Sequence, residues 1–253
     1  MKILLRFLKL FFENHFGYIA SLASVVGLIA IFLPNKNQTI LALIAFVICL
    51  LIIAIRAFWL LNKYLVDRNE NGLLNFATIA KYSTNDSKFI EFELYKFVQC
   101  KHILLYEYRH NFNWTGTNDP NITSSTLRFD SYNKKNTTGE YDAAIFKFNN
   151  PLLFNEVSVI HVKMDIDDAN QKSAPRLEIR VKEKTQLIQF KVELHYSKKT
   201  RNNAVIKRKK INSQINVEFE HLGNVQFNNN SKSYEHTILN PEVGYYYRLE
   251  WDR

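Results

Sequence analysis

Hydrophobic and polar positions divide the chain into two parts with different patterns. Phe16–Leu33 contains 18 residues without a charge, about 27 Å of helix, which nearly matches the roughly 30 Å hydrocarbon thickness of a bilayer. A second apolar run, Ile40–Leu61, is interrupted only by Arg56 near its end. Only Pro34–Gln38 separates the two runs, a connection too short for a domain. The pattern therefore predicts an antiparallel hairpin of two transmembrane helices over residues 16–61.

Short runs that alternate between apolar and polar residues follow later in the chain. The clearest run, 187–196, sets Ile188, Phe190, Val192, Leu194 and Tyr196 against Gln189, Lys191, Glu193 and His195, as in a strand with one buried face. A second predicted strand places Leu104, Tyr106, Tyr108, His110, Phe112 and Trp114 on one face. Further runs typical of strands are 126–132, 142–148, 157–166, 176–184, 205–211, 214–220 and 244–251. Eight or nine antiparallel strands without intervening helices predict a closed antiparallel β-barrel, with a β-sandwich as the alternative.

These patterns give a four-part organisation. Residues 1–15 repeat basic and apolar positions in the manner of an amphipathic interfacial segment. The two-helix hairpin follows at 16–61, a juxtamembrane linker at 62–85 and a β-rich cytoplasmic sensor domain at 86–253. Within that domain Ser87–Val98 fits either a weakly alternating strand or a short helix.

Charge sets the predicted orientation. The chain carries a formal net charge of +9, and six basic residues flank the hairpin against Lys36 alone in its loop. The excess of basic residues at the outer ends predicts a multi-pass membrane protein with both termini in the cytoplasm. Small residues on one face of each span let the helices approach closely, either within one hairpin or between subunits: Gly17, Ser21, Ser24, Gly27, Ala42 and Ala45.

Catalytic and metal-binding motifs are missing from the sequence. It has no nucleophile elbow, Walker loop, His-Glu-x-x-His or Cys-x-x-Cys motif, and its two cysteines and seven glycines are scattered. His161 and His195 alternate with the apolar residues of their runs and are expected at the surface. The sequence therefore predicts a protein that is not an enzyme and has no metal site or resident cofactor.

Arginines and aromatic residues on the predicted strands suggest a ligand site. Guanidinium groups bind phosphates bidentately and aromatic rings stack on bases. The candidate ligand-binding residues are Arg109, Trp114, Arg128, Tyr132, Arg176, Arg180, Tyr246 and Arg248. Exposed strand arginines and core tyrosines are the alternative explanation. A separate basic run, 198–210, is expected either to meet an anionic lipid or phosphate, or to protect a strand edge.

A family resemblance rests on two local features and on the architecture. Asn113-Trp114-Thr115-Gly116 lies near one predicted strand, and Gly244–Trp251 forms the last. With the hairpin and the strand-rich domain, they resemble the two-transmembrane β-barrel effectors of CBASS, cyclic-oligonucleotide-based antiphage signalling, and related systems. The resemblance implies a bacterial inner-membrane protein that senses a cyclic di- or oligonucleotide made by a cognate synthase.

The resemblance also implies how such an effector acts. Its transmembrane helices would oligomerise, disrupt the inner membrane and cause growth arrest or cell death, and the nucleotide would either trigger or restrain this step. A homo-oligomer is implied, and no direct DNA or RNA binding is expected. The alternative function is a membrane-tethered adaptor whose β-domain binds a protein partner. Basic residues inside a pocket favour the receptor, whereas the same residues confined to exposed strand faces favour the adaptor.

Overall fold

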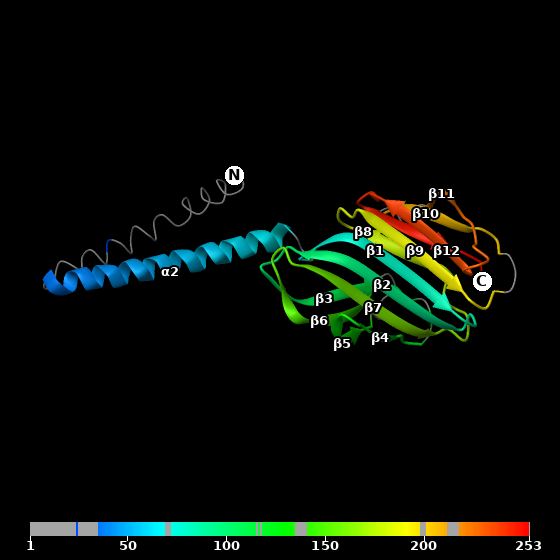
Figure 1. Cartoon of the computed structure of the whole chain (residues 1–253), viewed down its shortest axis with the longest axis horizontal. Coiled ribbons are helices and arrows are strands. Elements are labelled where there is room, and N and C mark those ends of the chain that lie inside the picture. Colours follow the sequence, from blue (N-terminus) through cyan, green and yellow to red (C-terminus); the bar gives the residue numbers. More distant parts are fainter. Residues whose placement is uncertain are drawn as a thin grey trace. The chain divides into compact units, whose positions relative to one another are not determined.

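A computed structural model describes residue 24 and residues 35–68, 72–114, 116, 118–134, 141–197, 201–211 and 218–252. The chain divides into two compact units, Met1–Arg68 and Asn69–Arg253 (Figure 1). The first contains the helix α2, Asn35–Arg68. The second, called the β unit below, contains all of the described strands.

The helix α2 is the one candidate membrane span in the described part of the chain. Its segment Leu43–Asp67 is long and apolar enough to cross a bilayer, and no residue of its most apolar window is buried within the protein. This segment overlaps the second predicted span, 40–61. Its charged residues are Arg56 near its middle, and Lys63 and Asp67 near the end that continues to the β unit.

The predicted two-helix hairpin and the multi-pass inner-membrane localisation are not supported. The described residues provide a single helix of spanning length, so the argument that placed both termini in the cytoplasm no longer holds. The first predicted span, 16–33, lies outside the described residues apart from Ser24, which is helical. Of the small residues expected to pack, Gly17, Ser21 and Gly27 also lie outside them.

The β unit consists of three sheets. The largest has the strand order β12-β9-β1-β2-β7-β4, the second β11-β10-β13-β8, and the third β3-β6-β5. The strands are β1 Leu73–Thr84, β2 Phe89–Cys100, β3 Leu104–Phe112, β4 Asn121–Thr123, β5 Leu127–Asn133, β6 Asp142–Leu153, β7 Val157–Asp167, β8 Arg176–Val181, β9 Leu187–Leu194, β10 Ala204–Lys210, β11 Glu220–Val225, β12 Ser233–Leu239 and β13 Tyr245–Glu250.

This topology contradicts the predicted closed antiparallel barrel. The three sheets are open, and they also differ from a two-sheet sandwich. One pairing is parallel: β1 runs alongside β9 with Ala77 opposite Leu187 and Thr84 opposite Leu194. Alternating hydrophobicity identifies the strands and their buried faces, but it contains no information on which strands become neighbours.

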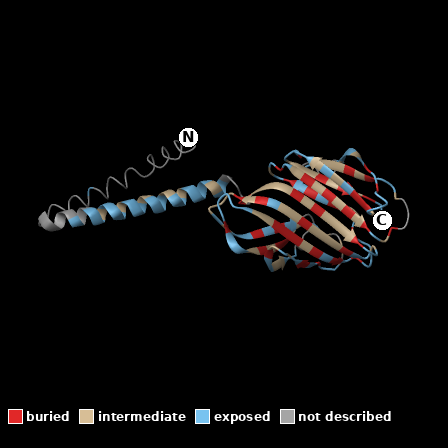
Figure 2. Ribbon diagram, viewed as in Figure 1, coloured by how far each residue is buried: buried red, intermediate tan, exposed pale blue. Residues whose placement is uncertain are grey.

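The core confirms the predicted burial of β9. Ile188, Phe190 and Val192 are fully buried, and Leu194 nearly so, while the intervening polar residues remain partly exposed on the other face. Figure 2 shows the alternation of buried and exposed positions along neighbouring strands. Side chains from all three sheets, including Phe146 and Leu249, share one hydrophobic cluster.

β1 lies inside the stretch that the sequence analysis assigned to a linker, 62–85. It pairs with β2 along its whole length, but the register shifts between Asn75 and Ala77. Such a bulge moves the following side chains to the opposite face and so interrupts the two-residue period. The strand is central in its sheet although its sequence does not alternate cleanly.

A second bulge corrects the predicted face of β3. The register against β6 shifts between Leu105 and Glu107, so the residues on the two sides of the bulge do not share one face. Tyr108 and His110 are buried as expected, whereas Tyr106 is 60% exposed. The same bulge places buried polar groups next to the cavity described below.

Candidate functional site

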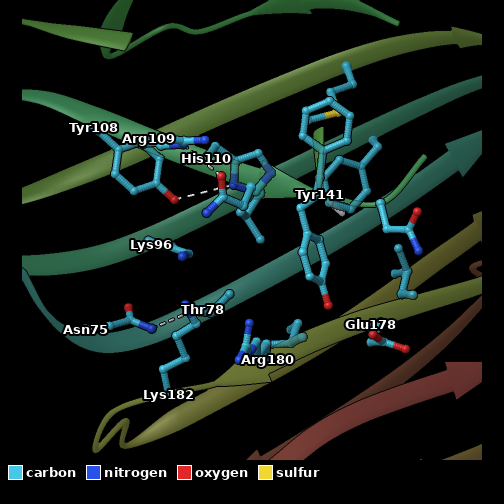
Figure 3. Close-up of a pocket in the computed structure, with 18 of the residues that line it drawn as sticks. Asn75, Thr78, Lys96, Tyr108, Arg109, His110, Tyr141, Glu178, Arg180 and Lys182 are labelled. Carbon is cyan, nitrogen blue, oxygen red and sulfur yellow. Dashed lines mark hydrogen bonds between the residues drawn. The ribbon is translucent and has the colours of Figure 1, made fainter. Parts of the chain in front are cut away.

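A cavity of about 590 Å³ opens in the β unit. Its lining comes from β1, β2, β3, β7 and β8, with Tyr246 from β13 and Tyr141 from the residue before β6 (Figure 3). The volume lies within the roughly 300–1,000 Å³ typical of sites for small-molecule ligands. Five cationic side chains line it: Lys96, Arg109, Arg176, Arg180 and Lys182.

Lys96 occupies an inward-facing position of β2, where the strand period would otherwise place an apolar residue. In β2 the residues Ile90, Leu94 and Val98 are buried, and the two-residue period places Lys96 on that same face. Its Nζ lies 5.6 Å from the centroid of the Tyr108 ring, within range of a cation–π interaction. The ammonium group thus lines the cavity beside an aromatic wall.

His110 faces the same cavity from β3. It is 93% buried, since its exposed fraction is 7%, and its Nδ1 lies 3.4 Å from the Tyr108 hydroxyl (Figure 3). The other ring nitrogen, Nε2, is buried without a hydrogen-bond partner. Burial, reinforced by the charge of Lys96, lowers the pKa of His110 to about 3. The imidazole is therefore neutral at physiological pH and can pair with a neutral polar group of a ligand.

The depressed pKa of His110 predicts an acid-dependent loss of stability. The unfolded chain takes up a proton at this imidazole near pH 6.5, the folded chain only near pH 3. Between these values acidification lowers the free energy of unfolding by up to about 1.4 kcal/mol per pH unit. Urea unfolding between pH 6.5 and 4.5 measures this effect. As the pH falls, the free energy of unfolding of the parent should decrease relative to that of His110→Gln by about this amount per pH unit. Parallel pH profiles would contradict the buried neutral imidazole.

Asn75 provides a second buried polar group on the cavity wall. Its amide nitrogen donates a hydrogen bond to Thr78 Oγ1 at 2.7 Å, while its Oδ1 is buried without a partner. Thr78 itself is 1% exposed. Buried polar atoms are normally paired, so the side-chain oxygen is available to accept a hydrogen bond from a bound molecule.

Arginine and tyrosine side chains gather where β8 approaches β13. Tyr246 lies opposite Arg180 in the register, and the Arg180 guanidinium carbon lies 5.4 Å from the centre of the Tyr246 ring. The hydroxyls of Tyr141 and Tyr246 are 2.9 Å apart. Burial raises the pKa of Tyr141 to about 12, so its hydroxyl remains protonated. This cluster joins a cation to flat aromatic surfaces.

Trp114 is held by the motif that the sequence analysis singled out. Its indole Nε1 donates a hydrogen bond to the Asn118 carbonyl oxygen at 2.7 Å. A Cβ at Gly116 would lie 1.9 Å from the Trp114 ring, so only glycine permits this approach. Asn118 and the lack of a side chain at Gly116 therefore fix the ring at the cavity, where it can offer a stacking face.

Some of the eight predicted ligand residues line the cavity and others lie elsewhere. Five of them line the cavity: Arg109, Trp114, Arg176, Arg180 and Tyr246. The other three are not among its lining residues. Arg128 is exposed on β5, and Tyr132 stacks on Phe112 with ring centroids 5.9 Å apart.

Arg248 is engaged on a strand face instead. Its guanidinium group contacts the Glu178 carboxylate at 2.8 Å and the Glu250 carboxylate at 3.0 Å. Phe219 covers it, with the ring centroid 3.7 Å from the guanidinium carbon. Glu178 lies 70 residues from Arg248 in the sequence, so the spacing of residues could not reveal that this arginine is already paired across the sheet.

The basic run 198–210 contributes to the fold through ion pairs. Lys207 binds Glu250 at 2.5 Å, and Arg208 binds Glu220 at 2.6 Å and Glu242 at 2.8 Å. The strand β10 lies between β11 and β13. This part of the run is consequently neither an edge strand nor an unpaired basic tip.

Sequence reasoning missed Lys96, His110, Asn75 and Lys182. A usable signal exists for Lys96, because a charged residue interrupts the alternating apolar positions 90, 92, 94 and 98 of its run. The sequence around Asn75 carries no such signal, because the bulge between Asn75 and Ala77 interrupts the two-residue alternation of β1. Burial raises the pKa of Glu183, another lining residue, and the charges of Lys96 and Lys182 partly offset this.

One side-chain arrangement resembles a hydrolase triad. Ser125 Oγ lies 2.7 Å from His161 Nδ1, and His161 Nε2 lies 3.3 Å from Glu93. His161 is buried, contrary to the surface position expected. The amide of Ser125 also binds that imidazole, and the amides of Thr126 and Leu127 both donate to the hydroxyl of residue 124. No amide of residues 125–127 is thus left for an oxyanion, and the arrangement fastens a turn to the sheet.

Within the described residues no group of three or more His, Cys, Asp and Glu side chains is placed to hold a metal ion. Cys49 and Cys100 are free cysteines. That the protein is not an enzyme and binds no resident cofactor stays a prediction.

Comparisons with known proteins give little more. No family model matches the sequence, and no curated protein matches it. Among solved structures, an M1 zinc metallopeptidase of Deinococcus radiodurans is 7% identical with a TM-score of 0.38, covering 71% of this chain and 42% of its own. Baculovirus P35 is also 7% identical with a TM-score of 0.33, covering 72% and 98%. The chain thus spans less than half of the metallopeptidase, and similarities this weak say nothing about its function.

Proposed function

We propose that the β unit is a receptor for a cyclic di- or oligonucleotide. The observation that carries the proposal is the cavity, in which Arg109, Arg176 and Arg180 accompany Trp114 and Tyr246. Guanidinium groups are suited to the phosphates, and the aromatic rings to the bases. Basic residues that line a pocket, rather than only exposed strand faces, favour a receptor over an adaptor for a protein partner.

The buried polar groups suit the neutral part of the same ligand. Asn75 Oδ1 accepts a hydrogen bond, and His110 Nε2 donates or accepts one according to its tautomer. A nucleobase offers both donors and acceptors on its edges. A phosphate-rich ligand without a base would leave these two groups unpaired, which costs binding free energy.

In the effector proposed from the resemblance, the bound nucleotide controls a membrane-damaging step in antiphage defence. The apolar helix α2 is the part of the described chain suited to act on a bilayer. Whether the nucleotide triggers or restrains that step is read from cell growth when the protein is expressed with and without a source of cyclic nucleotide.

Titration of the full chain in detergent tests the receptor directly. Isothermal titration calorimetry with a panel of cyclic dinucleotides and trinucleotides should show saturable binding of at least one member. Inorganic phosphate and the matching nucleoside, titrated separately, should bind far more weakly. Phosphate can contact only the guanidinium groups, and the nucleoside only the aromatic rings and the buried polar groups. Absence of binding across the panel would refute the receptor and favour the adaptor.

A further inference from the structure

Exposed apolar side chains gather at one end of the β unit. Five of them, called the apolar rim here, lie in turns and at strand ends: Leu104, Leu153, Phe154, Val157 and Leu239. Their exposed fractions range from 38% to 69%. Single exposed apolar residues are normal, whereas a group in one place marks an interaction surface.

Strand pairing and the β6–β7 turn bring four of the rim residues close together. Leu104 pairs with Leu153 across β3 and β6, and the Phe154 amide donates to the carbonyl oxygen of residue 103 at 3.2 Å. Val157 begins β7 opposite Gln99 of β2. The turn between β6 and β7 therefore carries apolar side chains from two different sheets.

The same hydrogen bonds connect the rim to the start of β1. Leu73 pairs with Cys100, whose carbonyl oxygen accepts the Asn155 amide at 2.8 Å. On the other side, Leu239 pairs with Leu187, which lies opposite Ala77 of β1. The rim thus surrounds the point at which the chain enters the β unit.

The chain arrives at this point directly from α2. Four residues separate Arg68, the last of α2, from Leu73, so the five steps between these two residues span at most about 18 Å. The last turns of α2 carry Trp59 and Lys63, whose Nζ lies 5.7 Å from the indole ring. Tryptophan and lysine near the end of an apolar helix mark the boundary between hydrocarbon and water.

We propose that α2 crosses a bilayer and that the apolar rim rests on the lipid surface of that bilayer. The polar groups of the rim suit this position. Glu156 uses its carboxylate to accept the Leu153 amide at 2.9 Å, and Lys101 Nζ lies 5.9 Å from the Phe154 ring. An aromatic ring with a neighbouring lysine is suited to the headgroup layer. The proposal concerns the membrane and does not depend on nucleotide binding.

The opposite end of the β unit supplies a matched control. Phe89 is 61% exposed and begins β2 after the turn that follows β1. The strand β1 contains 12 residues and spans about 35 Å, so Phe89 lies a full strand length from the rim. It has an aromatic side chain of similar exposure to the rim residues and no short connection to α2.

Site-specific fluorescence in vesicles tests the proposal. Phe154→Cys, Val157→Cys and Phe89→Cys are each labelled with the environment-sensitive dye NBD in a Cys49→Ala background, since Cys100 is fully buried. The full chain is reconstituted in phosphatidylcholine and phosphatidylglycerol vesicles that contain a lipid with a nitroxide near its headgroup. We expect loss of NBD emission at both rim positions and unchanged emission at position 89.

Two outcomes would overturn the proposal. If the nitroxide lipid quenches NBD at positions 154 and 157 no more than at position 89, the rim lies in water. Emission that shifts only with rising protein-to-lipid ratio, without quenching, would mean that a second copy covers the rim. Cyclic-nucleotide titration of the same labelled proteins reports on the receptor separately, so the two proposals can fail independently.

Discussion

Removing both Arg109 and Arg180 is expected to weaken cyclic-nucleotide binding by about 100-fold or more. A hydrogen bond to a charged group contributes roughly 1.5–3 kcal/mol, and each 1.4 kcal/mol corresponds to a factor of ten in affinity. Each single Arg→Ala variant should therefore bind about ten-fold more weakly than the parent. The two residues come from β3 and β8 and line the same cavity, so their losses should combine. Calorimetry with the best ligand of the panel measures all of these effects.

Arg128→Ala is the matched control for these variants. Its side chain is exposed on β5 and outside the cavity lining, so its loss should leave affinity unchanged within error. A uniform salt-dependent loss in Arg128→Ala as well as in the cavity variants would indicate attraction by net charge rather than a built site. Unchanged affinity in the double variant would remove Arg109 and Arg180 from the ligand site.

Replacing Phe190 by alanine is expected to lower the free energy of unfolding by about 3–5 kcal/mol. The side chain is fully buried in β9, the strand that joins β12 to β1 in the six-stranded sheet. Truncation removes the transfer free energy of the ring and leaves a cavity among packed neighbours. For a chain of this size the melting temperature should fall by about 10 °C. Chemical unfolding and thermal melts followed by tryptophan fluorescence measure the change.

Phe89→Ala serves as the comparison for the core variant. It removes the same ring from a position that is 61% exposed, where surface substitutions usually change stability by less than about 0.5 kcal/mol. Equal losses in the two variants would show that β9 is not at the centre of the core. Comparing the same substitution at two positions separates burial from residue type.

The sequence alone determined features that depend on local periodicity and composition. The alternation in 188–194 fixed the buried face of β9, because each strand residue turns opposite to its neighbours. The apolar run within α2 needed no tertiary context, since its length and composition suffice for a helix of spanning length. The chemistry of guanidinium and aromatic groups was enough to select Arg109, Arg180 and Trp114, which the structure places at one cavity.

Tertiary structure alone decided how these elements combine. The parallel pairing of β1 with β9 joins segments about a hundred residues apart, and the bulges at Asn75 and Leu105 change the outward face within a strand. A two-residue period describes one strand and cannot specify its neighbours or its bulges. This is why many of the strands were recognised, whereas β1 was missed and the closed barrel predicted from them was wrong.

Tertiary structure also decided which side chains pair with one another. Arg248 was chosen for its charge, yet Glu178 and Glu250 from neighbouring positions of the sheet pair with it. His110 looked like one residue of an apolar face, and only its burial beside Lys96 depresses its pKa. Charge and polarity are properties of a residue, whereas desolvation and pairing depend on which distant groups the fold brings within a few ångströms of it.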